Sequence, residues 1–308
     1  MKNFSWLLNR HVLSALCATP LLLSGATAFA DEMPAAEAAP AAAVEAAPAA
    51  APAEPVPDFT LSFNLGLYSE YMFRGVSLSD GPALQGGIDL GHKSGFYVGT
   101  WWSNIDKDYT GHGDGYSGGN HLETDWYFGY AHTFDSGFGI NMLGNYYYYP
   151  DREDSFSLVA QPGPSDGEKQ DSFEASIALS YKWFTYTYYN VLTDYYGTAK
   201  SLRNNPNDDT KNADYHELKV NYTLPIGDLN FMAKVGYQNT KNIQGDQGDY
   251  AIGLNRNFSI PSAGKPIEGF QAGGYYTNTF DVENEAFYFA GTRDVNEEKI
   301  WFYVKRTW

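Results

Sequence analysis

The feature that most constrains the fold of this chain is a two-residue alternation of apolar and polar side chains. In the segment 59–73, one set of alternate positions reads Phe59, Leu61, Phe63, Leu65, Leu67, Ser69, Tyr71 and Phe73. Successive side chains of a β-strand point to opposite faces, so the segment is predicted to be a strand with one apolar and one polar face. It is longer than the roughly 5–6 residues of a typical soluble strand. A tilted strand that crosses a bilayer needs about 9–11 residues, which this segment can supply.

The alternation recurs as far as Trp308, which predicts an all-β fold. The segments that can carry it are 59–73, 83–92, 96–105, 122–134, 138–149, 171–182, 184–192, 214–224, 229–239, 249–258, 269–280 and 299–308. Short connections (93–95, 135–137, 182–183, 225–228 and 259–268) alternate with longer polar ones (74–82, 106–121, 150–170, 193–213, 240–248 and 281–298). Short turns at one end and long loops at the other are typical of bacterial outer-membrane barrels. We therefore predict a single antiparallel transmembrane β-barrel of about 12 strands.

The N-terminal residues 1–30 have the features of a secretory signal peptide. Lys2 and Arg10 are basic, 12–23 is apolar, and Ala28-Phe29-Ala30 is a small-x-small cleavage site. Such a segment directs export through the Sec pathway and is too short for a spanning helix. A retained anchor helix is the alternative. Because Cys17 lies within this segment, the processed chain has no thiol for disulfides or thiolate chemistry.

Two further segments complete the domain organisation. Residues 31–57 are nearly all Ala, Pro and Glu, a composition that cannot build a core, so we predict a disordered periplasmic linker. It is either a passive tether or a cell-wall contact. Residues 58–308 form the barrel. The formal charge of the whole chain is −17, which argues against a nucleic-acid partner because phosphate binding needs clustered Lys and Arg.

The C-terminus ends in an alternating apolar pattern with a terminal aromatic. Ile300, Phe302, Val304 and Trp308 resemble the C-terminal signal that the bacterial barrel-assembly machinery recognises. Arg306 departs from this pattern. A charge facing lipid costs about 2–4 kcal/mol at mid-bilayer but roughly 0–1 kcal/mol near the interface, where Arg306 is expected. The expected partners are thus outer-membrane lipid and lipopolysaccharide, and the assembly machinery; a homo-oligomer is compatible with the sequence.

Aromatic residues are abundant, with 25 Tyr and 7 Trp. Their amphipathic rings favour the membrane interface, so we predict two aromatic girdles that include Trp101, Trp102, Trp126, 146–149 and 186–189. The alternative is that they are ordinary core aromatics.

The stretch 64–106 is similar to the opening of the TorF family of proteobacterial outer-membrane proteins. The closest matches are Ser69-Glu70-Tyr71-Met72-Phe73-Arg74-Gly75 and Gly95-Phe96-Tyr97-Val98-Gly99-Thr100-Trp101. The similarity extends over residues 58–308. It implies an outer-membrane barrel with a pore, and it supplies no catalytic residues and no substrate.

The alternation also predicts which charged side chains line the lumen. The predicted pore-lining residues are Glu70, Arg74, Asp89, Glu123, Asp125, Glu174, Lys182, Glu217, Lys219, Lys234 and Lys305. Both signs are present, so we expect neighbours to pair across strands. The set then either lines a transport path or forms a structural ion-pair network that rigidifies the barrel.

A calcium-like spacing occurs in one long loop, where Asp106, Asp108 and Asp114 alternate with glycines. Hard cations take several oxygen ligands, so this loop is a candidate calcium site; otherwise no cofactor is expected. Solvated acidic loop residues are the simpler interpretation.

We do not expect an enzyme. His92, His132 and His216 lie in predicted strands and His112 and His121 in a loop, and none belongs to a motif with a nucleophilic Ser. The expected function is a narrow channel for small hydrophilic or ionic solutes, with mild cation preference. The alternative is a closed barrel that binds an envelope or extracellular partner.

Overall fold

The computed structural model describes residues 57–106, 121–150, 170–198, 203–284, 289–290 and 293–308. The wall of the molecule consists of β1 (Phe59–Tyr68), β4 (Ala83–His92), β5 (Phe96–Asn104), β6 (Leu122–Thr133), β7 (Phe138–Tyr148), β8 (Ser172–Tyr181), β9 (Phe184–Val191), β10 (Asp214–Thr223), β11 (Leu229–Asn239), β12 (Gln247–Ile260), β13 (Ile267–Phe280) and β16 (Lys299–Thr307). Two small hairpins, β2 (Met72–Phe73) with β3 (Val76–Ser77) and β14 (Phe289–Ala290) with β15 (Arg293–Asp294), lie in loops.

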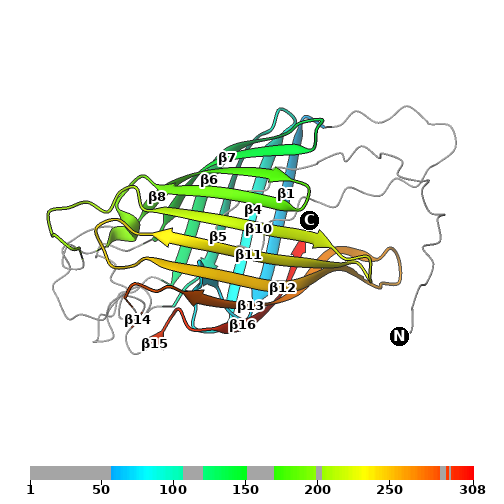
Figure 1. Ribbon diagram of the computed structural model, residues 1–308. Helices are drawn as coiled ribbons and strands as arrows, with labels where there is room; N and C mark the ends of the chain where they lie inside the picture. Colours follow the sequence, from blue (N-terminus) through cyan, green and yellow to red (C-terminus); the bar gives the residue numbers. More distant parts are fainter. Residues whose placement is uncertain (1–56, 107–120, 151–169, 199–202, 285–288, 291–292) are drawn as a thin grey trace, which may run out of the picture.

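The wall strands close into one antiparallel barrel (Figure 1). Neighbours in sequence are neighbours in space, and closure comes from β1 pairing with β16, where Leu65 lies opposite Arg306. The prediction of a single antiparallel barrel with twelve strands is confirmed. The described residues contain one short 3-10 helix, η1 (Tyr195–Gly197). None of their helices is long and apolar enough to cross a membrane.

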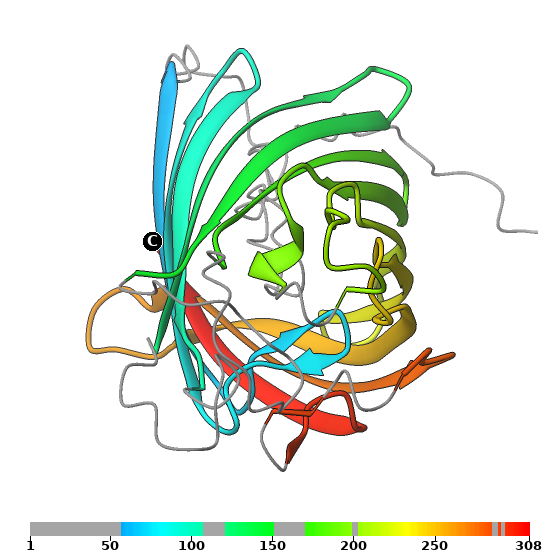
Figure 2. The same cartoon turned by 90° about the vertical axis from the view of Figure 1, so that its left-hand side faces the viewer.

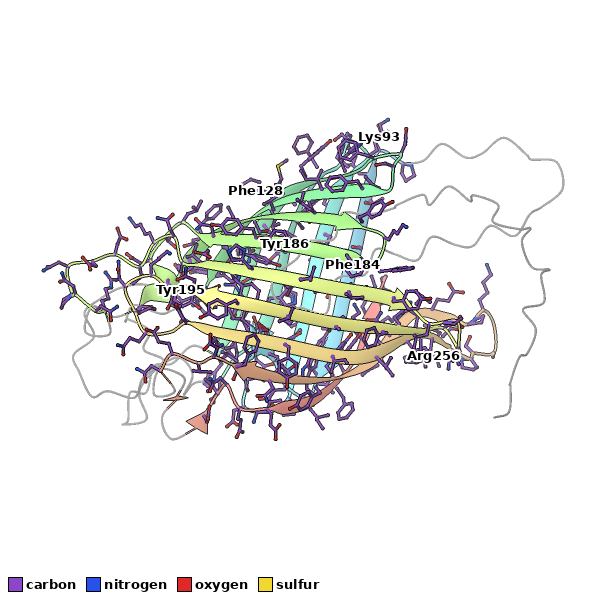
Figure 3. The ribbon with its side chains drawn as sticks, in the orientation of Figure 1. Lys93, Phe128, Phe184, Tyr186, Tyr195 and Arg256 are labelled. Carbon is purple, nitrogen blue, oxygen red and sulfur yellow. The ribbon has the colours of Figure 1, made fainter. Side chains whose placement is uncertain are left out.

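Large apolar side chains cover the outside of the barrel. On β1, Leu61 is 57% exposed, and the neighbouring apolar positions Phe59, Phe63, Leu65 and Leu67 are exposed with it. Phe128, Phe184 and Tyr186 also stand out from the wall (Figure 3). Exposed apolar side chains in this number cannot be stable against water, but they match the surface that a bilayer covers.

The two ends of the barrel differ in the length of their connections. At one end, which we call the turn end, the strands are joined by short segments such as 93–95, 134–137 and 182–183. At the opposite loop end they are joined by long segments, including 69–82 and 192–213. The predicted alternation of short and long connections is therefore present, although β12 and β13 extend further than predicted and leave only 261–266 between them.

The first predicted strand is too long. Alternation was expected to continue to Phe73, but β1 ends at Tyr68 and the chain then leaves the wall. The pairing with β16 ends at Ser69, whose N–H donates to the carbonyl of Phe302 at 2.8 Å and whose hydroxyl accepts from the N–H of Phe302 at 2.8 Å. Beyond this point Tyr71 and Phe73 are buried inside the barrel, not exposed on its outer face.

The aromatic residues divide between the two faces. Trp126, Tyr146, Tyr148 and Tyr186 are exposed outside, as expected of a girdle. The prediction is wrong for the residues of opposite parity, because Trp101, Tyr147, Tyr149 and Tyr189 point inward and are buried. Consecutive aromatics such as 146–149 must alternate between the faces of a strand, so only half of them can reach the membrane interface.

Candidate functional site: the barrel lumen

Most of the charged residues predicted to line the lumen lie on inward-facing strand positions. Asp89 is on β4, Glu123 and Asp125 are on β6, Glu174 is on β8, Glu217 and Lys219 are on β10, Lys234 is on β11, and Lys305 is on β16. Their neighbours of opposite parity, such as Ile88 and Leu218, are exposed on the outer face. The residues Glu70 and Arg74 also lie inside, but on a different element.

That element is the connection between β1 and β4, residues 69–82, which folds into the loop end of the lumen and which we call the inward hairpin. Figure 2 looks into the loop end and shows β2 and β3 within the outline of the barrel. The hairpin closes on itself through the N–H of Leu78, which donates to the carbonyl of Tyr71 at 2.8 Å, and through a hydrogen bond from Ser77 to Glu70. It is tied to the wall by the N–H of Asp106, which donates to the carbonyl of Leu78 at 2.7 Å.

Arg74 lies at the tip of this hairpin and is 2% exposed. Its guanidinium donates to Glu174 of β8 at 2.7 Å and to Gln238 of β11 at 2.7 Å. The guanidinium carbon also lies 5.1 Å from the ring centroid of Tyr189 and 4.4 Å from that of Tyr215, distances that permit cation–π attraction. One side chain therefore joins the hairpin to four consecutive wall strands, β8 to β11.

The backbone of the tip is equally confined. Gln247 of β12 donates to the carbonyl of Arg74 at 2.9 Å. Gly75 has a φ of +80°, and an added Cβ would lie 2.6 Å from Cγ2 of Thr279 and 2.9 Å from Cβ of Asp249. A glycine is required here both by the left-handed backbone and by the lack of space.

Aromatic rings fill the space around the hairpin. Tyr71 packs edge-on against Trp101 of β5, with centroids 5.4 Å apart, and its hydroxyl donates to Glu123 at 2.9 Å. Burial, followed by the charges of Glu123 and Asp125, raises the pKa of Tyr71 well above its usual value, so the hydroxyl remains a donor. Phe73 packs edge-on against Tyr147 and against Tyr196, a residue of η1. The segments 69–82 and 192–213 thus meet inside the loop end.

The charges on the β10–β12 side of the lumen are balanced. Glu217 pairs with Lys219 at 2.9 Å and with Lys234 at 3.5 Å, and Lys234 also lies 3.3 Å from Asp249. Tyr215 donates to the second oxygen of Asp249 at 2.6 Å. The predicted cross-strand pairing is therefore present on this side.

The β6–β7 side is different, because its carboxylates have polar neighbours but no base. Asn145 of β7 donates to Asp125 at 3.0 Å, and Tyr71 donates to Glu123. No ion pair joins Glu123 or Asp125 to a base within the described part of the chain. Both carboxylates are at most 1% exposed.

Burial of the inner face decreases from the loop end to the turn end. Along the inward positions of β10, Tyr215 and Glu217 are buried, Lys219 is half-buried, and Asn221 and Thr223 are exposed. The inner positions of β12 follow the same order, from buried Asp249 to exposed Asn257. Chemistry changes along the same direction: most charged side chains of the inner face lie at buried positions, and the exposed positions carry mostly neutral Ser, Thr and Asn.

Two of the predicted site assignments change or fall outside the described residues. Lys182 does not line the lumen: it is exposed in the two-residue turn between β8 and β9, with a φ of +56°, so the alternation no longer applies to it. Of the predicted calcium loop only Asp106 is described, while Asp108 and Asp114 lie outside the described residues. The described residues hold no group of three or more His, Cys, Asp or Glu side chains suited to a metal ion.

The C-terminal pattern has the expected orientation. Ile300, Phe302, Val304 and Trp308 are exposed on the outer face. The Arg306 guanidinium lies 5.2 Å from the ring of Phe270 and 4.6 Å from that of Trp308, and it donates to the carbonyl of Glu268 at 3.1 Å. Arg306 is thus held at the turn end, where its charge is tolerated. Recognition by the assembly machinery stays a prediction.

Several lumen residues were not anticipated from the sequence. The hairpin is held by Gln238 and Gln247, and the ion network includes Asp249. Three tyrosine hydroxyls also donate across the inner face: Tyr97 to Asn141, Tyr127 to Asp89, and Tyr215 to Asp249. Their inward orientation follows from the same alternation that identified Glu217 and Lys234. What was missing was any sign that a loop would enter the lumen and need these partners.

Comparison with known proteins gives a family but no described function. A family model described as a bacterial protein of unknown function (Gcw_chp) matches residues 51–308. That description carries no TorF name, which therefore stays a resemblance. No curated protein sequence matches the chain.

Solved structures with similar folds are barrels at very low sequence identity. A KdgM porin is 8% identical, with 80% of this chain and 98% of that chain covered and a TM-score of 0.44. A NanC porin is 8% identical over 80% of this chain and 98% of that chain, with a TM-score of 0.41. An outer membrane channel from Pseudomonas putida F1 is 10% identical over 82% of this chain and 96% of that chain, with a TM-score of 0.40. What this chain does must therefore be inferred from its own residues.

Proposed function

The chain belongs to the Gcw_chp family of bacterial proteins of unknown function, and we propose that it is an outer-membrane channel for small hydrophilic or ionic solutes, with a mild preference for cations. The observation that carries this proposal is a closed antiparallel wall with apolar side chains outside and polar, charged side chains inside. A barrel of this kind has no unpaired edge, which is the condition for a β-structure to cross a bilayer.

The proposed orientation follows from the connections. Outer-membrane barrels have short periplasmic turns and longer extracellular loops, so the loop end with the inward hairpin faces the exterior. The start of β1 and the end of β16 then lie on the periplasmic side, because both are at the turn end.

The inward hairpin supports a narrow path. It occupies the loop end of the lumen, and the surrounding inner-face side chains, including Tyr147, Tyr215 and Glu217, are almost fully buried. A solute that crosses the barrel must pass this hairpin or displace it. Large solutes are therefore excluded, and small hydrophilic or ionic solutes are the class that remains.

Charge supports the cation preference. From residue 58 onward the chain has 32 acidic and 18 basic residues. A negative potential at the mouth and along the lumen concentrates cations, and the effect weakens as salt screens the charges.

Planar-bilayer recording of the purified, processed protein tests the proposal. We expect discrete conductance steps, and in a salt gradient a reversal potential shifted toward that of the cation, with a smaller shift when both salt concentrations are raised. A flat trace at every salt concentration, both for the wild type and for a variant with a shortened hairpin, would contradict the channel.

A closed interaction barrel is the second candidate, and the burial of the hairpin tip favours it. If wild-type protein gives no steps while the hairpin-shortened variant conducts, the native barrel is closed. Co-purification of an envelope partner would then support an interaction role for the exterior loops.

A further inference from the structure

The charges at the loop end of the lumen are unevenly compensated. On the β10–β12 side, Lys219 and Lys234 face Glu217 and Asp249, and at the hairpin tip Arg74 faces Glu174. Glu123 and Asp125 of β6 have no such base among the residues that the structure describes. Two buried acidic groups thus lie side by side on one inner face, and no described residue supplies their counter-charge.

The oxygen atoms near these carboxyl groups include acceptors without donors. Oδ1 of Asp125, Oδ1 of Asn145 and Oε1 of Gln85 are buried and have no hydrogen-bond partner. Asn145 and Gln85 are each 2% exposed. The amide of Asn145 lies against Asp125, to which its nitrogen donates at 3.0 Å, so the unpartnered amide oxygen belongs to the same cluster.

Strand pairing places Gln85 on the same inner face, two strands away from Glu123. Gln85 of β4 is opposite Ser103 of β5, and Ser103 is opposite Glu123 of β6. Tyr71 of the inward hairpin covers this patch from the lumen side, since its hydroxyl donates to Oε1 of Glu123 at 2.9 Å. The patch is therefore enclosed between the wall and the hairpin.

A buried carboxylate without a counter-charge is strongly unfavourable, and unpaired buried acceptors usually indicate an ion or water that completes them. All the unpartnered atoms here are oxygens, from carboxylates and side-chain amides, which are the ligands that hard cations prefer. We propose that Glu123, Asp125 and Asn145 form a binding site for a hard divalent cation of the calcium type, enclosed beneath the inward hairpin.

The charge of the patch favours a divalent ion, because two carboxylates are neutralised by one such cation. Ca²⁺ accepts carboxylate and amide oxygens in flexible geometry, whereas Mg²⁺ demands near-ideal octahedral geometry and keeps more of its water. This site differs from the calcium-like loop of Asp106, Asp108 and Asp114. It also does not depend on conduction, so it goes beyond the proposed channel function.

Calcium binding to the processed protein in detergent tests this site. After removal of divalent ions with EDTA, equilibrium dialysis against CaCl2 is expected to give about one saturable Ca²⁺ per barrel, with weaker binding of Mg²⁺ from MgCl2. The variant E123Q/D125N should bind Ca²⁺ at least ten-fold more weakly. The matched control D108N/D114N removes the same two charges from the loop and should bind as the wild type does.

A third variant keeps the test informative if E123Q/D125N fails to fold. N145D adds a carboxylate to the same cluster and should tighten Ca²⁺ binding several-fold. Loss of binding in D108N/D114N with retention in E123Q/D125N would overturn the proposal in favour of the loop. Absence of saturable binding in both the wild type and N145D would also overturn it, and would mean that the buried carboxyl groups hold protons.

Discussion

The two halves of the lumen differ in both chemistry and burial. At the loop end the inner face carries Glu123, Asp125, Glu174, Glu217 and Lys234, and these side chains are buried. At the turn end the same strands present mainly neutral polar residues, such as Asn221 and Thr223 of β10, and these are exposed. The charged half is therefore the buried one.

This arrangement is the reverse of the simplest expectation, in which charged lumen residues face solvent. It is possible because the inward hairpin brings partners with it. Arg74 pairs with Glu174, and Tyr71 donates to Glu123. A buried charge is tolerated when it is paired and hydrogen-bonded. Among the described residues no such element enters the turn end, and its inner-face side chains are exposed to solvent.

Shortening the hairpin should abolish the difference between the halves and have the largest effect. Replacement of residues 70–80 by a short Gly-Ser linker opens the loop end, so we expect single-channel conductance to rise several-fold over the wild type. A linker of the same composition in place of 262–265 at the turn end is the control and should leave conductance unchanged. An unchanged conductance in the hairpin variant would show that the hairpin does not limit the path.

The Arg74–Glu174 pair should contribute most of the energy that holds the tip. In R74A the buried Glu174 keeps its charge and its hydrogen bond from Tyr147 but loses its counter-charge, and breaking a buried pair in this way costs about 3–5 kcal/mol. We expect the temperature midpoint of unfolding to be clearly lower than in the wild type, as measured by circular dichroism in detergent. The double variant R74A/E174Q also removes the charge of Glu174, so it should recover part of the stability that R74A loses.

An exposed ion pair provides the matched control. Lys93 and Asp58 lie 2.6 Å apart at the turn end, with both side chains about 60% exposed. Such pairs contribute roughly 0–1 kcal/mol, so K93A should leave the midpoint nearly unchanged. Equal effects of K93A and R74A would contradict the special role of the tip.

Two glycines with the same backbone conformation allow a smaller and sharper comparison. Gly75 at the hairpin tip has a φ of +80° and Gly137 at the turn end has a φ of +81°, but only Gly75 lacks room for a Cβ. Both G75A and G137A introduce the strain of a left-handed alanine, about 1 kcal/mol. G75A should in addition displace the tip and raise conductance modestly, whereas G137A should conduct as the wild type does. Identical conductance of the two variants would argue against tight docking of the tip.

The barrel could be predicted from the sequence because its signal is local. Alternation with a period of two determines which side of a strand each residue faces, and it placed Glu123, Glu174, Glu217 and Lys234 inside correctly. It also predicted the two classes of connection. Lys182 was wrongly predicted to face the lumen because β8 ends at Tyr181 and Lys182 already belongs to the turn. The sequence alone does not show at which residue the strand ends.

The inward hairpin could not be predicted, because its residues continue the alternation of β1. Tyr71 and Phe73 have the same parity as Leu65 and Leu67 and are likewise large hydrophobic residues. An apolar side chain that meets hydrocarbon and one that packs inside the lumen produce the same pattern. Only the contacts of Arg74 with strands that lie far away in the sequence distinguish the two, and these depend on the closed barrel.

The rate of thiol modification along β10 tests the contrast between the halves most directly. The chain has no cysteine after Cys17, so in a protein that begins at residue 31 single cysteines can be placed at inward positions 215, 217, 221 and 223 of one strand. A small charged methanethiosulfonate reagent should modify N221C and T223C rapidly, and Y215C and E217C at least ten-fold more slowly. When the hairpin is shortened, we expect the modification of Glu217→Cys to become as fast as that of N221C. Equal rates at all four positions in the intact protein would contradict a lumen whose inner face is buried at the loop end and exposed to solvent at the turn end.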